Sequence, residues 1–175
     1  EESSFLKDTI KNGHREFDDL ENFERKKYVL EYKENCMIAL THYPSLRRTK
    51  IKFTRRRIST TMMCRPRILS VFRRPGHRSY IIVFNKKKNF EGPLYDHIPS
   101  NAQIGVVGHE LAHIIDFENL STNQIMGRGI GMLSDHKRSL YEKYIDQLTI
   151  EHGLGKELLA WSEYVLFQSN ATEEY

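Results

Sequence analysis

Hydrophobic residues recur every three or four positions over four stretches of the chain, a spacing typical of helices with one buried face. The stretches are residues 14–43, 102–120, 134–152 and 156–168. The first lies between a glycine and a proline, which commonly bound helices, and we expect this long N-terminal helix to cover the core. The second is apolar on nearly every side, which predicts a central, buried helix.

Alternating hydrophobic and polar residues replace this spacing between the first two helices and predict strands. Residues 47–57 alternate basic or polar side chains with Ile51 and Phe53. Residues 68–72 are a second apolar run, and residues 79–85 form the clearest strand pattern. We expect a short, mainly antiparallel twisted sheet of three or four strands. The last strand is a plausible edge to which an extended peptide could add.

Glycine separates two of the predicted helices. Residues 121–133 carry glycine at every second position from 127 to 131, which predicts a mobile loop that could form a flap over the site. Together these elements predict an α+β fold in a single domain spanning residues 1–175. We expect loose ends at residues 1–13 and 170–175.

The composition is that of a folded globular chain, with 39% hydrophobic and 29% charged residues. No apolar run is long enough to span a membrane. Cys36 and Cys64 are too few for a disulfide framework. The chain begins at Glu1 rather than at methionine, so we expect that an upstream segment was removed. This favours an exported location, in the periplasm or cell envelope, over the cytoplasm.

Basic residues gather in three clusters, 55–57, 73–74 and 86–88, and the net charge is +4. Such clusters could bind the phosphates of a nucleic acid. They could also form a solvated outer sheet face whose charged strand ends discourage pairing of sheet edges. We favour the second interpretation because no nucleic-acid-binding motif accompanies the charge.

The most specific chemical pattern is His109-Glu110-x-x-His113, inside the apolar helix. On a helix these histidines lie one turn apart on one face, so both imidazoles can bind one metal ion. Glu110 lies about 100° around the axis, where it can take a proton from a water that the metal activates without being a ligand. The alternative is a pair of core histidines bonded to nearby carboxylates. A metal ion would satisfy these buried polar groups together.

Zinc peptidases supply three protein ligands and leave one position for water. One branch uses a third histidine six positions after the second, with a glycine between, but Asn119 and Asp116 stand there and exclude that branch. Another uses a glutamate on a later helix, followed four residues on by an aspartate. Glu142 and Asp146 offer that pair, with Asp146 placed to orient a ligand imidazole. Rival third ligands are His136, Asp135 and His152.

These five motif positions resemble the gluzincin branch of the zincin metallopeptidases. The longer segments 99–113 and 150–155 are similar to small zinc-peptidase-like proteins of Bacteroidetes. The resemblance implies a minimal zincin-like fold, with the active-site helix beneath the sheet and the third ligand on a following helix. It also implies zinc-dependent hydrolysis of a peptide or protein substrate, with Glu110 as the general base. A further donor should stabilise the oxyanion, and the candidates by position are His152, Tyr144 and Tyr141.

Two other functions stay open. A zincin-like protein without peptidase activity would keep the metal as part of a scaffold or binding module. A nucleic-acid binder would use the basic strands, including Arg55, Arg56 and Arg57. The zinc peptidase is the leading hypothesis because the histidine-glutamate pattern is the most specific feature of the chain.

Overall fold

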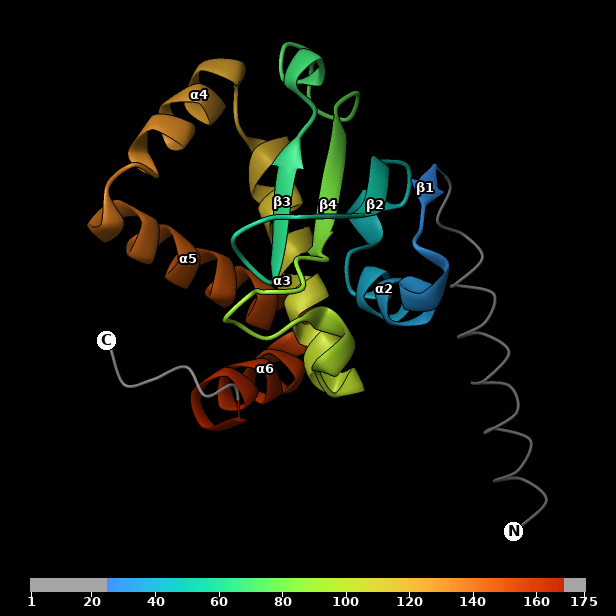
Figure 1. Ribbon diagram of the computed structural model, residues 1–175. Helices are drawn as coiled ribbons and strands as arrows, with labels where there is room; N and C mark the ends of the chain where they lie inside the picture. The colour runs from blue at the N-terminus through green and yellow to red at the C-terminus, as the bar shows by residue number, and fades with distance from the viewer. Residues whose placement is uncertain (1–24, 169–175) are drawn as a thin grey trace, which may run out of the picture.

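A mixed four-stranded sheet forms one layer of the protein within residues 25–168, which the computed structural model describes (Figure 1). The strands in chain order are β1 (Lys26–Lys27), β2 (Lys50–Arg56), β3 (Met62–Pro66) and β4 (Ser79–Asn85). Their order across the sheet is β1-β2-β4-β3. β1, β2 and β4 are parallel, and β3 is antiparallel to β4.

Helices lie behind, beside and below this sheet in the view of Figure 1. They are α2 (Lys33–Thr41), α3 (Ser100–Asn119), α4 (Thr122–Gly131), α5 (Asp135–Thr149) and α6 (Gly155–Gln168). Short 3-10 turns stand at η1 (Leu30–Tyr32), η2 (Pro44–Leu46), η3 (Ile68–Ser70) and η4 (Tyr95–His97), and a π-helical turn, η5 (Ile150–Leu154), joins α5 to α6. Gly153 has a φ of 85°, a conformation that glycine adopts without strain, so the chain can turn there.

The predicted α+β fold class is confirmed, but the expectation of a mainly antiparallel sheet is wrong. β1 and β2 are joined through α2, and a helical crossover makes the strands that it connects parallel. The predicted strand 79–85 is present as β4, yet it is central, between β2 and β3. Residues 68–72 are not a strand. The edge strands are β1 and β3, and β3 ends at Pro66, where the backbone has no N–H to donate.

The predicted helix over residues 14–43 is too long. Residues 25–32 form β1 and η1 instead, and the helix begins only at Lys33. The part of this prediction before residue 25 lies outside the described residues. The Tyr28 ring stacks on Phe53 of β2, with centroids 5.2 Å apart. Packing against the sheet therefore outweighs the helical spacing over this segment.

The predicted loop 121–133 contains helix α4, so the expectation of a glycine-rich flap is wrong. Ser121 and Gln124 form a capping box, in which each side chain bonds the backbone N–H of the other residue. This cap satisfies two N–H groups that the first turn of a helix leaves unpaired. It offsets part of the low helix propensity of the three glycines.

α3 is the central helix, in agreement with its apolar pattern, and Leu111 on it is fully buried. Helix α6 approaches so closely that a Cβ added at Gly105 would lie 2.2 Å from the Glu157 carbonyl oxygen. On another side the Tyr43 hydroxyl donates a hydrogen bond to the Gly108 carbonyl at 2.8 Å. The backbone of the helix that carries the histidine pattern is therefore fixed by close contacts on two sides.

The other predicted helices, 102–120, 134–152 and 156–168, correspond to α3, α5 and α6 within a few residues. Within the described part of the chain, none of the helices has the length and apolar character needed to cross a bilayer.

Candidate metal centre

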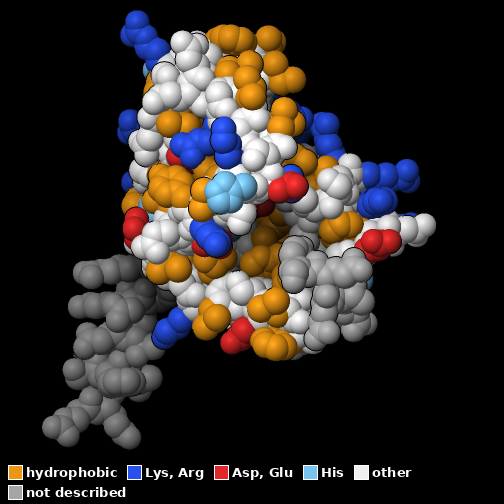
Figure 2. All heavy atoms as spheres, turned by 90° about the vertical axis from the view of Figure 1, so that its left-hand side faces the viewer, with side chains coloured by type: hydrophobic (Ala, Val, Ile, Leu, Met, Phe, Trp, Pro, Cys, Tyr) orange, Lys and Arg blue, Asp and Glu red, His pale blue; other side chains and the backbone are white. Residues whose placement is uncertain are grey.

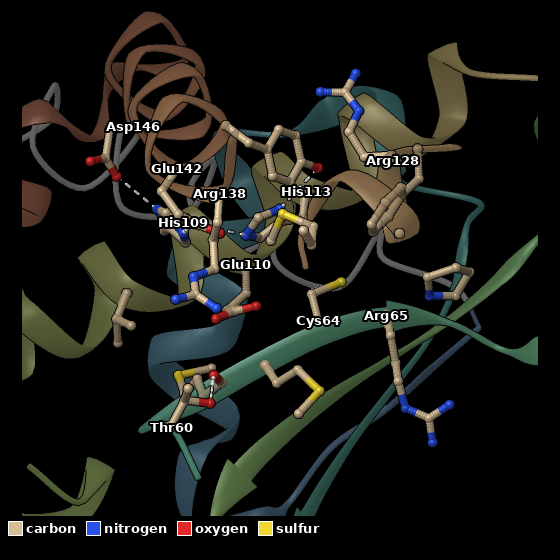
Figure 3. A pocket seen from close by; sticks show the side chains of 18 of the residues that line it. Thr60, Cys64, Arg65, His109, Glu110, His113, Arg128, Arg138, Glu142 and Asp146 are labelled. Carbon is tan, nitrogen blue, oxygen red and sulfur yellow. Dashed lines mark hydrogen bonds and ion pairs between the residues drawn. The ribbon is translucent and has the colours of Figure 1, made fainter. Parts of the chain in front are cut away.

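Helices α3 and α5 bring two histidines and a glutamate together (Figure 3). His109 and His113 come from α3 and Glu142 from α5, and their ligand atoms lie within 4.8 Å of one another. The Nε2 atoms of the two histidines lie 3.0 Å and 3.6 Å from the same oxygen, Oε2 of Glu142. The three side chains form a group that could hold a metal ion.

Two of the separations in this group are close to those of a metal site, and zinc serves as the example. Two atoms bound tetrahedrally to one zinc ion, each at about 2.0–2.1 Å, lie about 3.3 Å apart. The separations of 3.0 Å and 3.6 Å fall on either side of that value. Two imidazoles with one glutamate are also a known ligand set of catalytic zinc sites. The three residues are therefore a donor set that could hold a metal ion.

Asp146, one turn beyond Glu142 on α5, orients His109. Its Oδ1 lies 2.8 Å from His109 Nδ1, so Nδ1–H donates to the carboxylate and Nε2 faces Glu142. Burial lowers the pKa of His109, but the hydrogen bonds to Asp146 and Glu142 outweigh burial and raise this pKa to about 10. Burial raises the pKa of Glu142, but the two histidines outweigh it and lower this pKa to about 2. Without a metal, His109 is a cation between two carboxylates.

A buried chain of polar groups orients His113. Its Nδ1 lies 3.2 Å from the Tyr141 hydroxyl, and that hydroxyl donates to Asp116 at 2.9 Å. Because the Tyr141 hydroxyl donates its proton to Asp116, its oxygen accepts a hydrogen bond from His113 Nδ1–H. The Arg128 guanidinium pairs with Asp116 at 3.1 Å and lies 4.5 Å from the centre of the Tyr141 ring. Both histidines therefore present Nε2 to Glu142.

Glu110 lies beside the cluster without belonging to it (Figure 3). It is only 6% exposed, and its Oε2 has no hydrogen-bond partner among the described residues. Burial raises the pKa of this carboxyl above its ordinary value, against the opposing effect of His113 and His109. A buried oxygen without a partner is costly, and a water molecule in the site would provide one.

The cluster opens into a hollow of about 1650 Å³ (Figure 2). Residues 60–66 form one wall, and no described strand pairs with the outer edge of β3. The amides of Asn85 and Arg67 bond across β3 and β4. Because such bonds alternate along an antiparallel pair, the backbone groups of Met62 and Cys64 point to the open edge. Residues of α4 and η3 line one end of the hollow, and residues of α6 line the other.

The structure does not bring the rival ligands to the cluster. His136 is exposed and lies six residues before Glu142 on α5, which turns it about 240° away around the helix. His152 lies in η5, where its ring stacks on Tyr43, so it is also misplaced as an oxyanion donor. Asp135 lines the hollow but forms an ion pair with Arg138.

The two tyrosine candidates for the oxyanion donor also have other roles. Tyr141 lies at the site, but its hydroxyl is engaged by His113 and Asp116. Tyr144 is 47% exposed and does not line the hollow. Neither the sequence pattern nor its spacing pointed to Arg128 as part of the site. The signal that could have found it is the Ser121 capping motif, because a helix there carries Arg128 back toward α3.

Comparisons with protein-family models, with curated proteins and with solved structures gave no match. The function is therefore inferred from the geometry of the site.

Proposed function

We propose that the protein is a zinc-dependent metallopeptidase. The proposal rests on the convergence of His109, His113 and Glu142 beside Glu110, a buried carboxylate with one unpartnered oxygen among the described residues. A bound zinc ion would polarise a peptide carbonyl and make water acidic enough to react near neutral pH.

Different residues around the metal centre would have different roles in the reaction. Glu110 would take a proton from the attacking water and pass it to the leaving amine, because burial raises its pKa above the ordinary value and so makes it a stronger base. Asp146 and Tyr141 would keep the two imidazoles in the tautomer with a free Nε2. The hollow would admit the substrate while the buried side of the cluster excludes bulk water.

An extended polypeptide is the substrate class that fits best. The open edge of β3 runs along the hollow, where the Met62 carbonyl accepts from the Thr60 hydroxyl at 2.7 Å and the Cys64 backbone bonds the Glu110 carboxylate, so an added peptide would compete with these local bonds. A peptide that adds to this edge would be held by main-chain hydrogen bonds, whatever its side chains are. Its backbone would then pass beside the cluster.

Replacing Glu110 by glutamine tests the proposal. We expect the wild type to bind about one zinc ion per chain and to cleave a mixed peptide library. Glu110→Gln should keep the zinc but cleave about 10²–10⁴-fold more slowly, since only the general base is lost. Glu163→Gln, an exposed change of the same kind on α6, is the control and should behave as wild type. Zinc content is measured by elemental analysis, and cleavage by mass spectrometry.

Other outcomes discriminate between the functions. Equal cleavage by Glu110→Gln and wild type would refute the mechanism. A wild type that binds zinc yet cleaves no peptide would instead be a metal-stabilised scaffold. A protein that binds no zinc would contradict both.

A further inference from the structure

Three large apolar side chains protrude from the turn that follows β3. Ile68, Leu69 and Phe72 are 73%, 85% and 72% exposed, and we call them the tip cluster. The turn lies at the upper end of the molecule in Figure 1, beside the end of the sheet. In Figure 2 hydrophobic side chains gather at the top of the face that carries the hollow. Met126 of α4, 55% exposed, borders the same end of the hollow as Ile68 and Phe72.

Hydrogen bonds from buried and half-buried residues fix the backbone of this turn in the conformation that exposes the tip cluster. The Ser70 hydroxyl oxygen lies 2.8 Å and 2.9 Å from the carbonyl oxygens of Arg67 and Ser79, either of which can accept its proton, and it accepts from the Ser79 N–H. The Thr122 hydroxyl donates to the Val71 carbonyl at 2.9 Å. Ser70 and Val71 are buried while their apolar neighbours face water.

A buried arginine strengthens the base of the same turn. Arg78 is only 2% exposed. Its guanidinium donates to the carbonyls of Arg73 at 3.0 Å and Leu120 at 2.7 Å. These bonds tie the end of the turn at Arg73 to the end of α3 near Leu120.

Exposed arginines surround the tip cluster. Arg67 precedes it, and Arg73 and Arg74 follow it; all three are exposed and form no ion pair with any residue that the structure describes. The wider segment is one-sided in charge. Residues 35–90 contain fifteen lysines and arginines and no aspartate or glutamate, although the whole chain has 23 acidic residues.

The outer face of the sheet continues this positive surface. Lys27, Lys52, Ile81 and Arg65 are paired in one row across all four strands, so their side chains share one face. The buried Ile51 and Phe53 take the opposite face. In Figure 3 the Cys64 side chain points toward the histidines of the candidate metal centre, and the Arg65 side chain points away from them.

We propose that the tip cluster and its arginines are a docking surface for an anionic lipid bilayer. Apolar side chains that protrude beside basic ones match a membrane interface, where the former enter the acyl region and the latter meet the phosphates. A nucleic acid would meet the charge, but three adjacent exposed apolar side chains gain more from an acyl region than from base edges and phosphates. The proposal does not depend on peptidase activity. It would place the mouth of the hollow near the membrane surface.

Vesicle sedimentation tests this proposal with the full chain. We expect binding to phosphatidylcholine vesicles that contain phosphatidylglycerol, weak binding to phosphatidylcholine alone, and a loss of binding as salt increases. The triple variant Arg67→Gln, Arg73→Gln, Arg74→Gln should bind on the order of 100-fold more weakly. The triple variant Ile68→Ser, Leu69→Ser, Phe72→Ser should lose at least about 10-fold.

Matched controls carry the same kinds of change elsewhere. Leu166→Ser with Phe167→Ser alters two residues on α6 that are 70% and 79% exposed, and it should bind vesicles as wild type. A tryptophan reporter in a Trp161→Phe background adds a second readout, since Leu69→Trp should be quenched by brominated lipids whereas Phe167→Trp should not. Melting temperatures confirm that every variant is folded.

Three results would overturn the proposal. The first is no binding to anionic vesicles, or equal loss in the α6 control. The second is binding to duplex DNA that the tip-cluster variant leaves unchanged, with no vesicle binding. The third is a wild-type dimer in light scattering that the tip-cluster variant converts to a monomer, since the surface would then hold a second copy of the chain.

Discussion

The two histidines of the cluster lie four residues apart on one helix, yet different surroundings orient them. His109 is held by Asp146, whose side chain is 46% exposed. His113 is held through Tyr141 by Asp116, whose side chain is only 4% exposed and pairs with Arg128. One support is a single carboxylate at the protein surface, and the other is a buried network.

The two histidines of one motif therefore depend on two kinds of interaction, a solvent-screened carboxylate and a buried hydrogen-bond network. An exposed carboxylate contributes little to folding because water and salt screen it. A buried network contributes more when it is broken, because its remaining members lose their partners without regaining water. We therefore expect the Asp116 side of the cluster to control folding and the Asp146 side to control mainly metal affinity and protonation.

The largest effect should follow from Asp116→Ala. It leaves the Arg128 guanidinium and the Tyr141 hydroxyl without their acceptor, and we expect a loss of about 3 kcal/mol in the free energy of unfolding. Asp135→Ala removes the acceptor of an exposed pair with Arg138, and it should cost less than about 1 kcal/mol. Urea unfolding of the metal-free proteins measures both. Equal losses would show that burial does not distinguish the two supports.

A smaller effect should follow from Tyr141→Phe, which deletes one hydroxyl from the network. We expect about 1–2 kcal/mol less stability and about 10–100-fold weaker zinc binding, because His113 loses the group that sets its tautomer. Tyr144→Phe is the control and should change neither quantity. Ring ¹⁵N chemical shifts of His113 report the tautomer directly. An unchanged Nδ1–H signal in Tyr141→Phe would contradict the assigned role.

The smallest effect on folding should follow from Asp146→Ala, on the order of 1 kcal/mol in the metal-free protein near neutral pH, because water and salt screen the half-exposed carboxylate that raises the pKa of His109. Zinc binding should still weaken by about 10-fold or more. The pKa of His109 is about 10, so zinc must displace its proton at pH 7. We expect about one proton released per zinc for wild type and fewer for Asp146→Ala. Calorimetry in buffers of different ionisation enthalpy measures this release, and equal release would rule out Asp146 as the cause.

The same two pKa shifts set the pH range in which the metal-free cluster stabilises the fold. The contribution of His109 is complete below its ordinary pKa of 6.5 and is lost as the pH rises toward 10. That of Glu142 is complete above its ordinary pKa of 4.5 and is lost as the pH falls toward 2. The cluster should therefore contribute most between about pH 4.5 and 6.5, and melting curves from pH 3 to 9 would show a plateau there.

Local periodicity was enough to predict several elements. The apolar pattern placed α3, and the uninterrupted hydrophobic run placed β4. It was not enough where a distant partner competed. Residues 25–32 have helical spacing, but Tyr28 packs on Phe53 and the segment pairs with β2 instead. The order of the strands could not be predicted either, because no local sequence pattern indicates that β4 lies between β2 and β3.

The candidate site also combines features that the sequence predicts with features that only tertiary contacts decide. That His109 and His113 share a helix face, and that Glu142 and Asp146 share another, follows from the α-helical repeat and needs no knowledge of the fold. That these two faces meet, that the Tyr141 hydroxyl reaches Asp116, and that Arg128 returns on α4 to close the network depend on contacts between separate helices. Side-chain spacing within one helix is set by backbone geometry, whereas the meeting of helices is set by packing of the whole core.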